Sequence, residues 1–571
     1  MASMPDTPPR PFPGGLSERR TAAARLWRAL SIEVAPETLI VVAALYWTLA
    51  ANGAFFRASL QSAPTQGAAS WLMLPALAVA VASLHVLLMA AVGWRRLLKP
   101  LLALLTVVAA LAGHFMQTYK VYLDPDMVRN VLHSHTAEAG ELLSGTLVLH
   151  LLLYAALPVA LLLPLRLKAR RWPRALLARS LLVLGALLAF VAALLSVFQP
   201  LSSLMRNHRE VRYLITPANI IYSTTRVVAA DVKGKAAPRE AIGLDAQPGP
   251  SWAAQQRPRV LVLVVGETAR AANWGLSGYA RQTTPQLAAL PVVNFAEVSS
   301  CGTNTEVSVP CMFAPRGRRD YDESRIRGQE SLLHVLARAG VTVHWRDNQS
   351  GCKGVCDGLP GDRALDAAGA AASGLCRDGQ CYDEALLHDI DARLDAASGT
   401  QLWVLHQLGN HGPAYARRHP PAFSRFTPEC RSDDLGQCSR EQIVNAYDNA
   451  LLYTDHLLAT LQRRLAARAG RIDAAMLYVS DHGESLGESG LFLHGMPYPI
   501  APSEQKRVPM VMWLGDGFAA GTRVDLGCLR ERARRPASHD HLFHTVLGLL
   551  DVRTALYEPD WDLAAGCRAG M

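Results

Sequence analysis

The stretch Val260-Leu-Val-Leu-Val-Val-Gly-Glu-Thr268 decides the fold of the C-terminal half of this chain. Six consecutive apolar residues that stop at Glu267 are typical of a strand buried on both faces. Met476-Leu-Tyr-Val-Ser-Asp-His-Gly-Glu-Ser485 repeats the pattern and stops at Asp481 and His482. Because active residues of open α/β sheets gather at the carboxyl ends of strands, both segments predict parts of one site.

Strand and helix patterns alternate throughout residues 259–571. Strands are predicted at Val260–Val265, Val341–Trp345, Leu402–His406, Met476–Ser480 and Val508–Trp513. Helical segments lie between them, among them Glu330–Ala339 and Glu441–Arg464. This alternation predicts an α/β domain with a largely parallel sheet.

The N-terminal 199 residues have the pattern of a membrane domain. Five apolar runs approach the roughly 20 residues that a spanning helix needs: about Pro36–Phe56, Ser70–Gly93, Leu101–Tyr119, Thr146–Leu165 and Ser180–Phe198. We therefore expect a transmembrane domain at 1–199, with an external helical loop at 120–145. Membrane-surface helices and a linker are expected at 200–258, and the soluble catalytic domain at 259–571.

Positive residues predict how these spans are oriented. They cluster before the first span, between the second and third, and between the fourth and fifth: Arg19, Arg20, Arg25, Arg28; Arg95, Arg96, Lys99; Arg166, Lys168, Arg170, Arg171, Arg174, Arg179. By the positive-inside rule the N-terminus is cytoplasmic, and five spans place the C-terminal domain outside. Much of the net charge of +9 thus orients helices, so it is weak evidence for an acidic partner.

All ten cysteines lie between Cys301 and Cys567, in the part expected outside. An even number in close pairs indicates a disulfide framework in an oxidising compartment. The expected pairs are Cys301–Cys311, Cys352–Cys356, Cys376–Cys381, Cys430–Cys438 and, as a fifth, Cys528–Cys567. A cytosolic zinc-cysteine site is the alternative, but the spacings are irregular and no Cys-x-x-Cys repeats.

The segment Ser299-Ser-Cys-Gly-Thr-Asn-Thr-Glu-Val-Ser-Val-Pro-Cys311 is the predicted source of a nucleophile. Five hydroxyls are chemically able to act: Ser299, Ser300, Thr303, Thr305 and Ser308. Capping a helix is their alternative role. A helix that begins near Thr305 would also place free amides beside a phosphate group.

Glu267, Asp481 and His482 each follow an apolar strand. Carboxylate oxygens with an imidazole suit zinc, and a site that keeps a position for substrate or nucleophile is catalytic. His411 and His494 stand in glycine-bounded loops. Each histidine alone is as readily a loop or core residue, but together they favour a metal-centred site. Lys353 is either a phosphate-binding cation or a surface lysine.

Ordered motifs then give a family resemblance. They are Gly-Glu-Thr at 266–268, Ser-Cys-Gly-Thr-Asn-Thr at 300–305, Cys-Lys-Gly-Val-Cys at 352–356, Gly-Asn-His-Gly-Pro at 409–413 and Ser-Asp-His-Gly-Glu-Ser at 480–485. With five N-terminal spans, the chain resembles the lipid A phosphoethanolamine transferases, a group that includes the mobilised colistin-resistance enzymes. The resemblance implies an alkaline-phosphatase-like, sulfatase-like α/β domain in the periplasm of a Gram-negative bacterium, tethered to the inner membrane.

The resemblance also assigns roles to residues. Thr305 is implied as the nucleophile, and Glu267, Asp481 and His482 as ligands that hold zinc with it. Positions linked to a second zinc or to substrate fall on His411, His494, Lys353 and Glu484. Donor-lipid contacts fall on one helical face of the external loop, at Asn130, Ser134 and Glu138, with Tyr119 nearby. Gln349 stands where asparagine is expected, and Ser134 where some members have threonine.

The implied reaction transfers phosphoethanolamine from phosphatidylethanolamine to a phosphate of lipid A through a phosphothreonine, conferring resistance to cationic peptides such as polymyxin. We expect a monomer that acts at the membrane and binds no nucleic acid. A sister transferase acting on a core sugar or another glycan is the alternative. Less favoured are a phosphoglycerol transferase, a zinc or lipid sensor, and a sulfatase, for which Cys311-Met-Phe-Ala-Pro-Arg316 has the wrong spacing.

Overall fold

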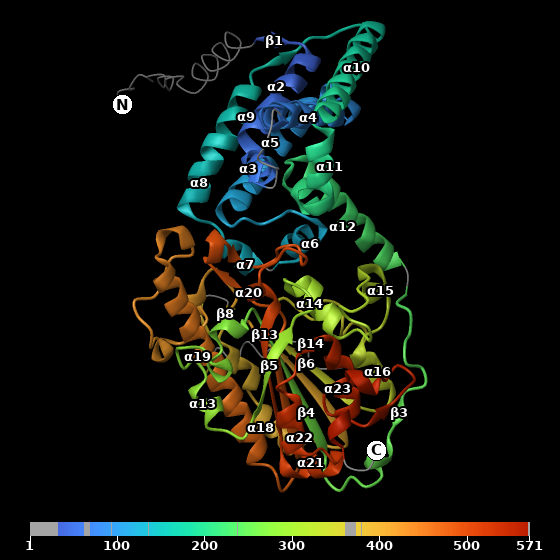
Figure 1. Ribbon diagram of the computed structural model, residues 1–571, viewed down its shortest axis with the longest axis vertical. Coiled ribbons are helices and arrows are strands. Elements are labelled where there is room, and N and C mark those ends of the chain that lie inside the picture. The colour runs from blue at the N-terminus through green and yellow to red at the C-terminus, as the bar shows by residue number, and fades with distance from the viewer. Residues whose placement is uncertain are drawn as a thin grey trace, which may run out of the picture. The chain divides into compact units, whose positions relative to one another are not determined.

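The computed structural model describes residues 32–61, 69–92, 94–134, 136–236, 238–359, 373–377 and 380–568 (Figure 1). The chain divides into two compact units. The first contains Met1–His114 and Leu147–Ala218, and the second contains Phe115–Thr146 and Asn219–Met571. The loop expected outside the membrane therefore belongs to the same unit as the C-terminal α/β fold. Arg19, Arg20, Arg25 and Arg28 lie outside the described residues.

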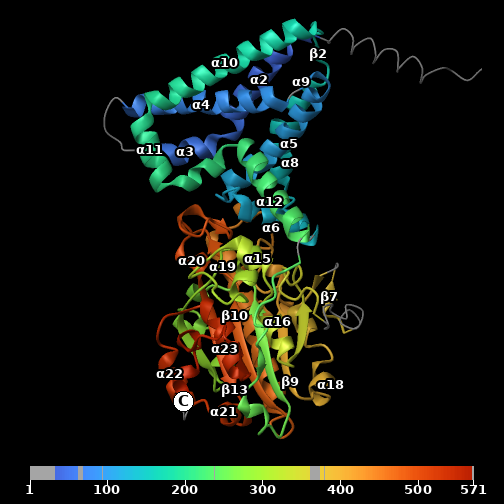
Figure 2. The same ribbon diagram turned by 90° about the vertical axis from the view of Figure 1, so that its right-hand side faces the viewer.

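The first unit is built from apolar helices. Four of the described helical stretches are long and apolar enough to span a membrane: Leu72–Val92 of α4 (Ala69–Val92), α5 (Arg95–Thr118), Gly145–Leu162, and α10 (Trp172–Ser196). The third stretch combines α8 (Gly145–Leu151), the π-turn η1 (Leu152–Ala156) and α9 (Leu157–Leu162). Figure 2 shows α10 beside α4, and none of the spanning window of α10 is buried by protein. A helix that is apolar all round and uncovered is suited to lipid.

The first predicted span is bent. It is a pair of helices, α2 (Pro36–Ala51) and α3 (Gly53–Gln61), that meet at an angle of 58°. Asn52 stands at the break and is fully buried. Its amide nitrogen donates to the carbonyls of Trp47 and Thr216, at 2.8 and 2.7 Å, and its oxygen accepts from the Thr216 amide at 2.9 Å. The bend therefore leaves no unpaired polar group of Asn52 in an apolar surrounding.

The stretch expected to form surface helices is helical. It consists of α11 (Phe198–Asn207), the 3₁₀ helix η2 (Arg209–Leu214) and α12 (Ala218–Ala236). The boundary between the two units falls at the start of α12.

The second unit contains a seven-stranded sheet in the order β14-β5-β13-β10-β4-β9-β6. The strands are β4 (Arg259–Gly266), β5 (Val293–Ser299), β6 (Thr342–Asp347), β9 (Thr400–His406), β10 (Asp473–Ser480), β13 (Arg507–Leu514) and β14 (Ala537–Ser538). All five predicted strands are present. The sheet is mixed, because β13 runs antiparallel to both β10 and β5 while the other four pairs are parallel.

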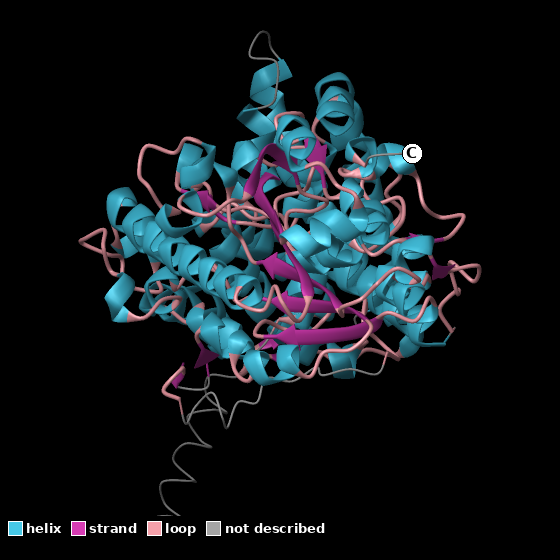
Figure 3. Cartoon of the chain, turned by 90° about the horizontal axis from the view of Figure 1, so that it is seen from below, coloured by secondary structure: helices cyan, strands magenta, loops and turns pink. Residues whose placement is uncertain are grey.

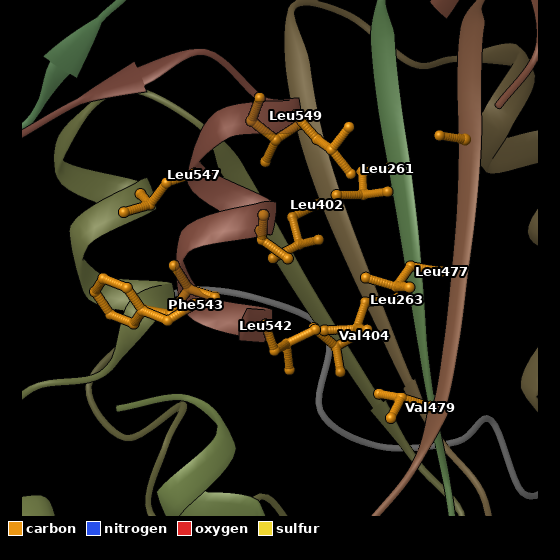
Figure 4. Packing of buried hydrophobic residues seen from close by; sticks show 14 of the residues in the cluster. Leu261, Leu263, Leu402, Val404, Leu477, Val479, Leu542, Phe543, Leu547 and Leu549 are labelled. Atoms are coloured by element: carbon orange, nitrogen blue, oxygen red, sulfur yellow. The ribbon is translucent and has the colours of Figure 1, made fainter. Parts of the chain in front are cut away.

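One face of this sheet is covered by α14 (Thr305–Met312), α16 (Leu332–Arg338) and α23 (Asp540–Leu549). Alternate residues of β4, β9 and β10 point toward these helices, as strand geometry requires. Figure 4 shows Leu542 and Leu549 of α23 directed at Leu261, Leu402 and Val404. Each of these five side chains is at most 2% exposed.

Helices also cover the opposite face, so the sheet lies between two helical layers (Figure 3). The longest is α19 (Arg440–Ala466), which begins at a capping box in which the Ser439 and Gln442 side chains each bind the other's backbone amide. β4 is consequently buried along its whole length. Among the described residues the structure pairs all ten cysteines, in the five pairs that the sequence analysis expects.

Candidate active site

Three acidic and imidazole side chains converge at the ends of two neighbouring strands. β4 and β10 are parallel, with Gly266 opposite Ser480, and the Asp481 amide donates to the Gly266 carbonyl at 2.9 Å. Glu267, Asp481 and His482 therefore leave the sheet side by side, and each is completely buried. Their strand-end positions, which the sequence predicts, place them in one small volume.

The candidate nucleophile lies at the start of α14. The Asn304 side chain caps this helix by accepting from the Val307 amide at 3.0 Å, so Thr305 is its first residue. The Thr305 hydroxyl oxygen lies 3.1 Å from Oε2 of Glu267 and 3.4 Å from Nε2 of His482. Only 3% of Thr305 is exposed.

The other four hydroxyls of the 299–311 segment make backbone hydrogen bonds instead. Ser300 and Thr303 donate to the carbonyls of Gly302 and Met496, both at 2.6 Å. Ser308 donates to the Asp481 carbonyl, and Ser299 lies 3.5 Å from the Ala537 carbonyl. Of the five candidates, the structure directs Thr305 at the carboxylate.

Glu267, Asp481 and His482 fit a divalent cation. One ligand atom from each lies within 4.8 Å of the others. The Nδ1 of His482 is 2.9 Å from the Gly483 carbonyl, which makes Nδ1 the donor and leaves Nε2 with a lone pair beside both carboxylates. Oδ2 of Asp481 is buried without a hydrogen-bond partner in the described structure. Because buried carboxylates require compensation, this donor set fits a metal ion.

His494 and His411 lie next to this centre. The ring centroids of His482 and His494 are 4.4 Å apart, and those of His494 and His411 are 5.3 Å apart. Burial, followed by the neighbouring His494 and Arg418, lowers the pKa of His411 well below its ordinary value. Burial thus favours the neutral form of His411, whose buried Nδ1 has no hydrogen-bond partner in the described structure. Both properties suit a metal or substrate ligand.

Glu484 supports His494 in this arrangement. Oε2 of Glu484 is 2.9 Å from Nδ1 of His494, and Oε1 accepts a hydrogen bond from the Tyr415 hydroxyl at 2.8 Å. With both oxygens engaged, the carboxylate fixes the ring of His494. Tyr415 has no role predicted from the sequence. It follows β9, at the start of the 3₁₀ turn Tyr415–Arg417, and belongs to none of the motifs.

Lys353 is a buried lysine and not a surface one. Its side chain is 5% exposed, and Nζ lies 3.0 Å from Oε1 of Glu306. Gln349 belongs to the same loop, where its amide donates to Asp347 at 2.8 Å and its side-chain oxygen accepts from Ser350. The structure thus joins Lys353 to α14 and engages the Gln349 side chain within its own loop.

Glu306 is a site residue that sequence analysis missed. It follows Thr305 directly and is 2% exposed. Burial alone would raise the pKa of its carboxyl, but the hydrogen bond with His133 and the charges of Lys353 and Arg327 lower it to about 2. The signal that the sequence offers is a lone acidic residue directly before the largely apolar segment Val307–Met312.

The external loop differs from the prediction. It forms α6 (Pro125–His133) and α7 (Thr136–Glu141), separated by Ser134, whose backbone is extended and whose hydroxyl donates to the Asn130 carbonyl at 2.7 Å. The prediction that Asn130, Ser134 and Glu138 share one helical face is therefore wrong. Glu138 is in α7, and its side chain lies outside the described residues.

Within the second unit, α6 packs against α14, the helix that begins at Thr305 (Figure 1). Arg129 of α6 is 4% exposed and forms ion pairs with Asp231 and Glu323. Tyr119, which precedes the loop, is buried and stacks on Phe115 with ring centroids 5.9 Å apart. α14, which begins with Thr305, therefore contacts the external loop at one side and carries the hydroxyl that faces Glu267.

Comparisons with known proteins agree with this organisation. The family model described as Sulfatase matches residues 259–552, and the model described as Phosphoethanolamine transferase EptA/EptB matches residues 81–232. Phosphoethanolamine transferase EptA of Escherichia coli strain K12 is 37% identical, over 93% of this chain and 96% of that protein. Phosphatidylethanolamine transferase Mcr-1 of Escherichia coli is 35% identical, over 91% of this chain and 95% of that protein.

A solved structure also matches almost the whole chain. It is the integral membrane protein lipooligosaccharide phosphoethanolamine transferase A (EptA) from Neisseria meningitidis, with a TM-score of 0.87 and 37% identity. The match covers 93% of this chain and 98% of that one. Both the apolar helices and the α/β unit thus have counterparts in a single membrane protein.

Proposed function

Because this chain belongs to the phosphoethanolamine transferase family, we propose that it transfers phosphoethanolamine from phosphatidylethanolamine to a phosphate of lipid A. The observation that carries the proposal is the Thr305 hydroxyl, 3.1 Å from Glu267 and beside His482 at the ends of two strands. A hydroxyl held against a buried carboxylate and an imidazole is an activated nucleophile.

The transfer proceeds in two displacements. In the first, the Thr305 hydroxyl gives its proton to the Glu267 carboxylate, 3.1 Å away, while its oxygen forms a bond to the phosphorus of the donor and the bond from phosphorus to the diacylglycerol oxygen breaks. His494, held by Glu484 at 2.9 Å, gives a proton to the leaving oxygen. In the second, a hydroxyl of the lipid A phosphate gives its proton to His494, its oxygen bonds to phosphorus, and the Thr305–phosphorus bond breaks as the Thr305 oxygen takes back a proton from Glu267. Covalent catalysis thereby divides one hard displacement into two.

Glu267, Asp481 and His482, with Thr305 itself, are the residues that would hold zinc. When bound, zinc would lower the pKa of the Thr305 hydroxyl and offset negative charge at the phosphorus. The protein contributes the buried geometry that keeps these groups together and excludes water. Lys353 and the neutral His411 bind phosphoryl oxygens as charge develops on them. A second zinc at His411 and His494 is the alternative to this role of His494, because a nitrogen that binds zinc cannot give the proton.

We place the enzyme in the inner membrane of a Gram-negative bacterium, with the catalytic domain at 259–571 in the periplasm. Five disulfides fit an oxidising compartment. Donor lipid is bound at the external loop near Asn130 and Ser134. The product carries an added amine, so cationic peptides such as polymyxin bind the modified surface less well. Relatives named Kdo(2)-lipid A phosphoethanolamine 7''-transferase match only 51% of the chain, so a lipid A phosphate is the preferred acceptor.

Mass spectrometry of lipid A tests the proposal. A polymyxin-sensitive host would express the wild type, Thr305→Ala, or Ser299→Ala, which removes a hydroxyl from the same segment. We expect a phosphoethanolamine mass increment with the wild type and Ser299→Ala, and none with Thr305→Ala. Unmodified lipid A in every strain, despite membrane-inserted protein, would refute the acceptor, and an increment on core sugars would identify the sister activity.

A further inference from the structure

We propose that Glu306 is a positioning residue that holds Lys353 beside Thr305 and joins this lysine to the external loop through His133. The inference rests on the proposed function, in which Lys353 binds a phosphoryl oxygen during transfer. It adds a residue that acts on the reaction through Lys353, without touching the reacting atoms.

The first support is the burial and pairing of Glu306. It is the second residue of α14, directly after the nucleophile, and its side chain is 3% exposed. A carboxylate in this place opposes the approach of an anionic phosphodiester unless its charge is balanced. Lys353 balances it at 3.0 Å, and the lysine side chain is itself 5% exposed. The pair is therefore sequestered from solvent at the first turn of α14, the helix that begins with Thr305.

The second support is the loop that carries Lys353. The backbone of Lys353 is left-handed, with φ of 50°. Gly351, two residues before it, and Gly354, directly after it, also have positive φ. A disulfide between Cys352 and Cys356 closes the loop around the lysine. A non-glycine residue in this conformation is maintained only where its surroundings determine it. The loop is thus built to direct this side chain inward.

The third support is the number of donors on Lys353. A lysine ammonium has three N–H donors. Within the described structure two are engaged, one by Glu306 and one by the Ser350 hydroxyl. The remaining donor is available to a phosphoryl oxygen. Glu306 and Ser350 therefore fix the direction of Lys353 without consuming its capacity to bind substrate.

The fourth support is the second oxygen of Glu306. Oε2 lies 3.4 Å from Nδ1 of His133 and 3.5 Å from Nη2 of Arg327, which also donates to the Glu306 carbonyl. His133 ends α6, and its other ring nitrogen is 3.3 Å from Asp231. A single carboxylate thus binds one group from the external loop and two from the catalytic fold. Docking of the loop and placement of Lys353 are thereby joined.

Steady-state kinetics with the full-length protein in detergent would test this role, using phosphatidylethanolamine with a fluorescent acyl chain and measuring released diacylglycerol. Glu306→Gln keeps the shape and removes the charge. We expect kcat to fall at least tenfold with a smaller change in KM for the donor, and Glu306→Asp to retain more activity than Glu306→Gln. Glu323→Gln, which alters a nearby acidic residue paired with Arg129 and Arg327, is the matched control and should keep the wild-type kcat.

A double substitution separates a role through Lys353 from a merely structural one. If Glu306 acts through Lys353, then Glu306→Gln combined with Lys353→Ala is no slower than Lys353→Ala alone. Rate losses that multiply in the double variant, or full activity of Glu306→Gln, would overturn the proposal.

Chemical labelling gives a readout that does not depend on activity. Reductive methylation with peptide mass spectrometry should label Lys353 slowly in the wild type and in Glu323→Gln, and several-fold faster in Glu306→Gln. Equal labelling in all three proteins would contradict the positioning role. A wild type without transferase activity but with Glu306-dependent labelling would refute the proposed function while leaving the placement of Lys353 intact.

Discussion

Gly409 determines where the backbone of Glu267 can lie. Its φ is +53°, and a Cβ atom added there would stand 2.6 Å from the Glu267 carbonyl oxygen and 2.9 Å from the Glu267 nitrogen. Both are backbone atoms, so neither can move aside independently. The Glu267 carboxylate lies within hydrogen-bond distance of the Thr305 hydroxyl. A displacement of the backbone at Gly409 would therefore also move the group that contacts Thr305.

Gly409→Ala is therefore expected to lower transfer activity at least tenfold. A left-handed alanine costs about 1–2 kcal/mol, and relief of the clash displaces Glu267. Metal content by mass spectrometry and the lipid A product would both fall. Gly470→Ala, at a glycine with nothing within 4 Å of an added Cβ, is the control and should behave as the wild type. Full metal content and activity in Gly409→Ala would contradict the argument.

Metal removal should reveal how far the buried carboxylates depend on a cation. A chelator would remove the cation from between two buried carboxylates, and Oδ2 of Asp481 has no hydrogen-bond partner in the described structure. We expect the Tm of the wild type to fall by several degrees and to recover with zinc. Asp481→Asn should show little response to the chelator. A Tm that is insensitive to chelation in both proteins would argue against the metal site.

Residues named by local motifs were predictable, and those defined by long-range pairing were not. Glu267, Asp481 and His482 each follow a strand, so a parallel sheet brings them together without knowledge of any side-chain contact. Glu306 acquires its role from Lys353 and from His133, which lies 173 residues earlier in the chain. No periodic pattern in the sequence indicates that Glu306 pairs with Lys353 and His133. The interaction of Gln349 with Ser350 likewise depends on the turn adopted by its loop.

At the scale of elements, charged groups hold α6 in place together with the buried Met127 and Val128. Arg129 is buried between two carboxylates, and Asp124 caps the helix by accepting from the Met127 amide at 2.9 Å. Burial, with the charge of Glu323, raises the pKa of Asp126 to about 6, although neighbouring arginines act against this. The raised pKa means that the folded protein keeps a proton on Asp126 that the unfolded chain releases.

This gives a pH prediction for α6. Between about pH 4 and pH 6 the folded state binds more protons at Asp126 than the unfolded state, so its contribution to the free energy of unfolding decreases as pH rises. Asparagine does not titrate, so Asp126→Asn removes this decrease in the free energy of unfolding. The Tm of the variant should therefore exceed that of the wild type at pH 8 and not at pH 4. The variant keeps the other charged residues that face Asp126: Asp124, Arg129, Arg318, Glu323 and Arg327. An equal difference in Tm at both pH values would contradict the assignment.

Strands with an unbroken run of apolar residues were predicted, and strands in which polar residues interrupt that run were missed. β4 and β9 are buried along their whole lengths, and each contains an unbroken apolar run, Val260–Val265 and Leu402–Leu405. β5 alternates between buried and exposed residues and contains Asn294 and Glu297, so its apolar run is interrupted. β14 has two residues, too few for any period. The break at Ser134 escaped prediction because i,i+4 spacing continues across it in sequence.

At the scale of the whole molecule, the orientation of the spans can be tested with engineered cysteines. All ten native cysteines are in disulfides, so a new thiol is uniquely reactive. Leu143, in the external loop, is 72% exposed, and Lys168 lies between α9 and α10. In spheroplasts, a membrane-impermeant maleimide should label Leu143→Cys and not Lys168→Cys. The reverse pattern would refute the predicted topology, and labelling of both after lysis serves as the control.

The second unit is assembled from two pieces of chain, and this has a consequence for biosynthesis. The 115–146 piece leaves the ribosome first, yet Glu141 pairs with Arg418, 277 residues later, and Thr146 with Asp434, 288 residues later. During translation the partners of the early piece therefore have not yet been synthesised when this piece emerges. A nascent chain halted before those partners emerge has a membrane anchor but no completed loop. Maturation of this enzyme is thus ordered in time, with the loop among the last parts to settle.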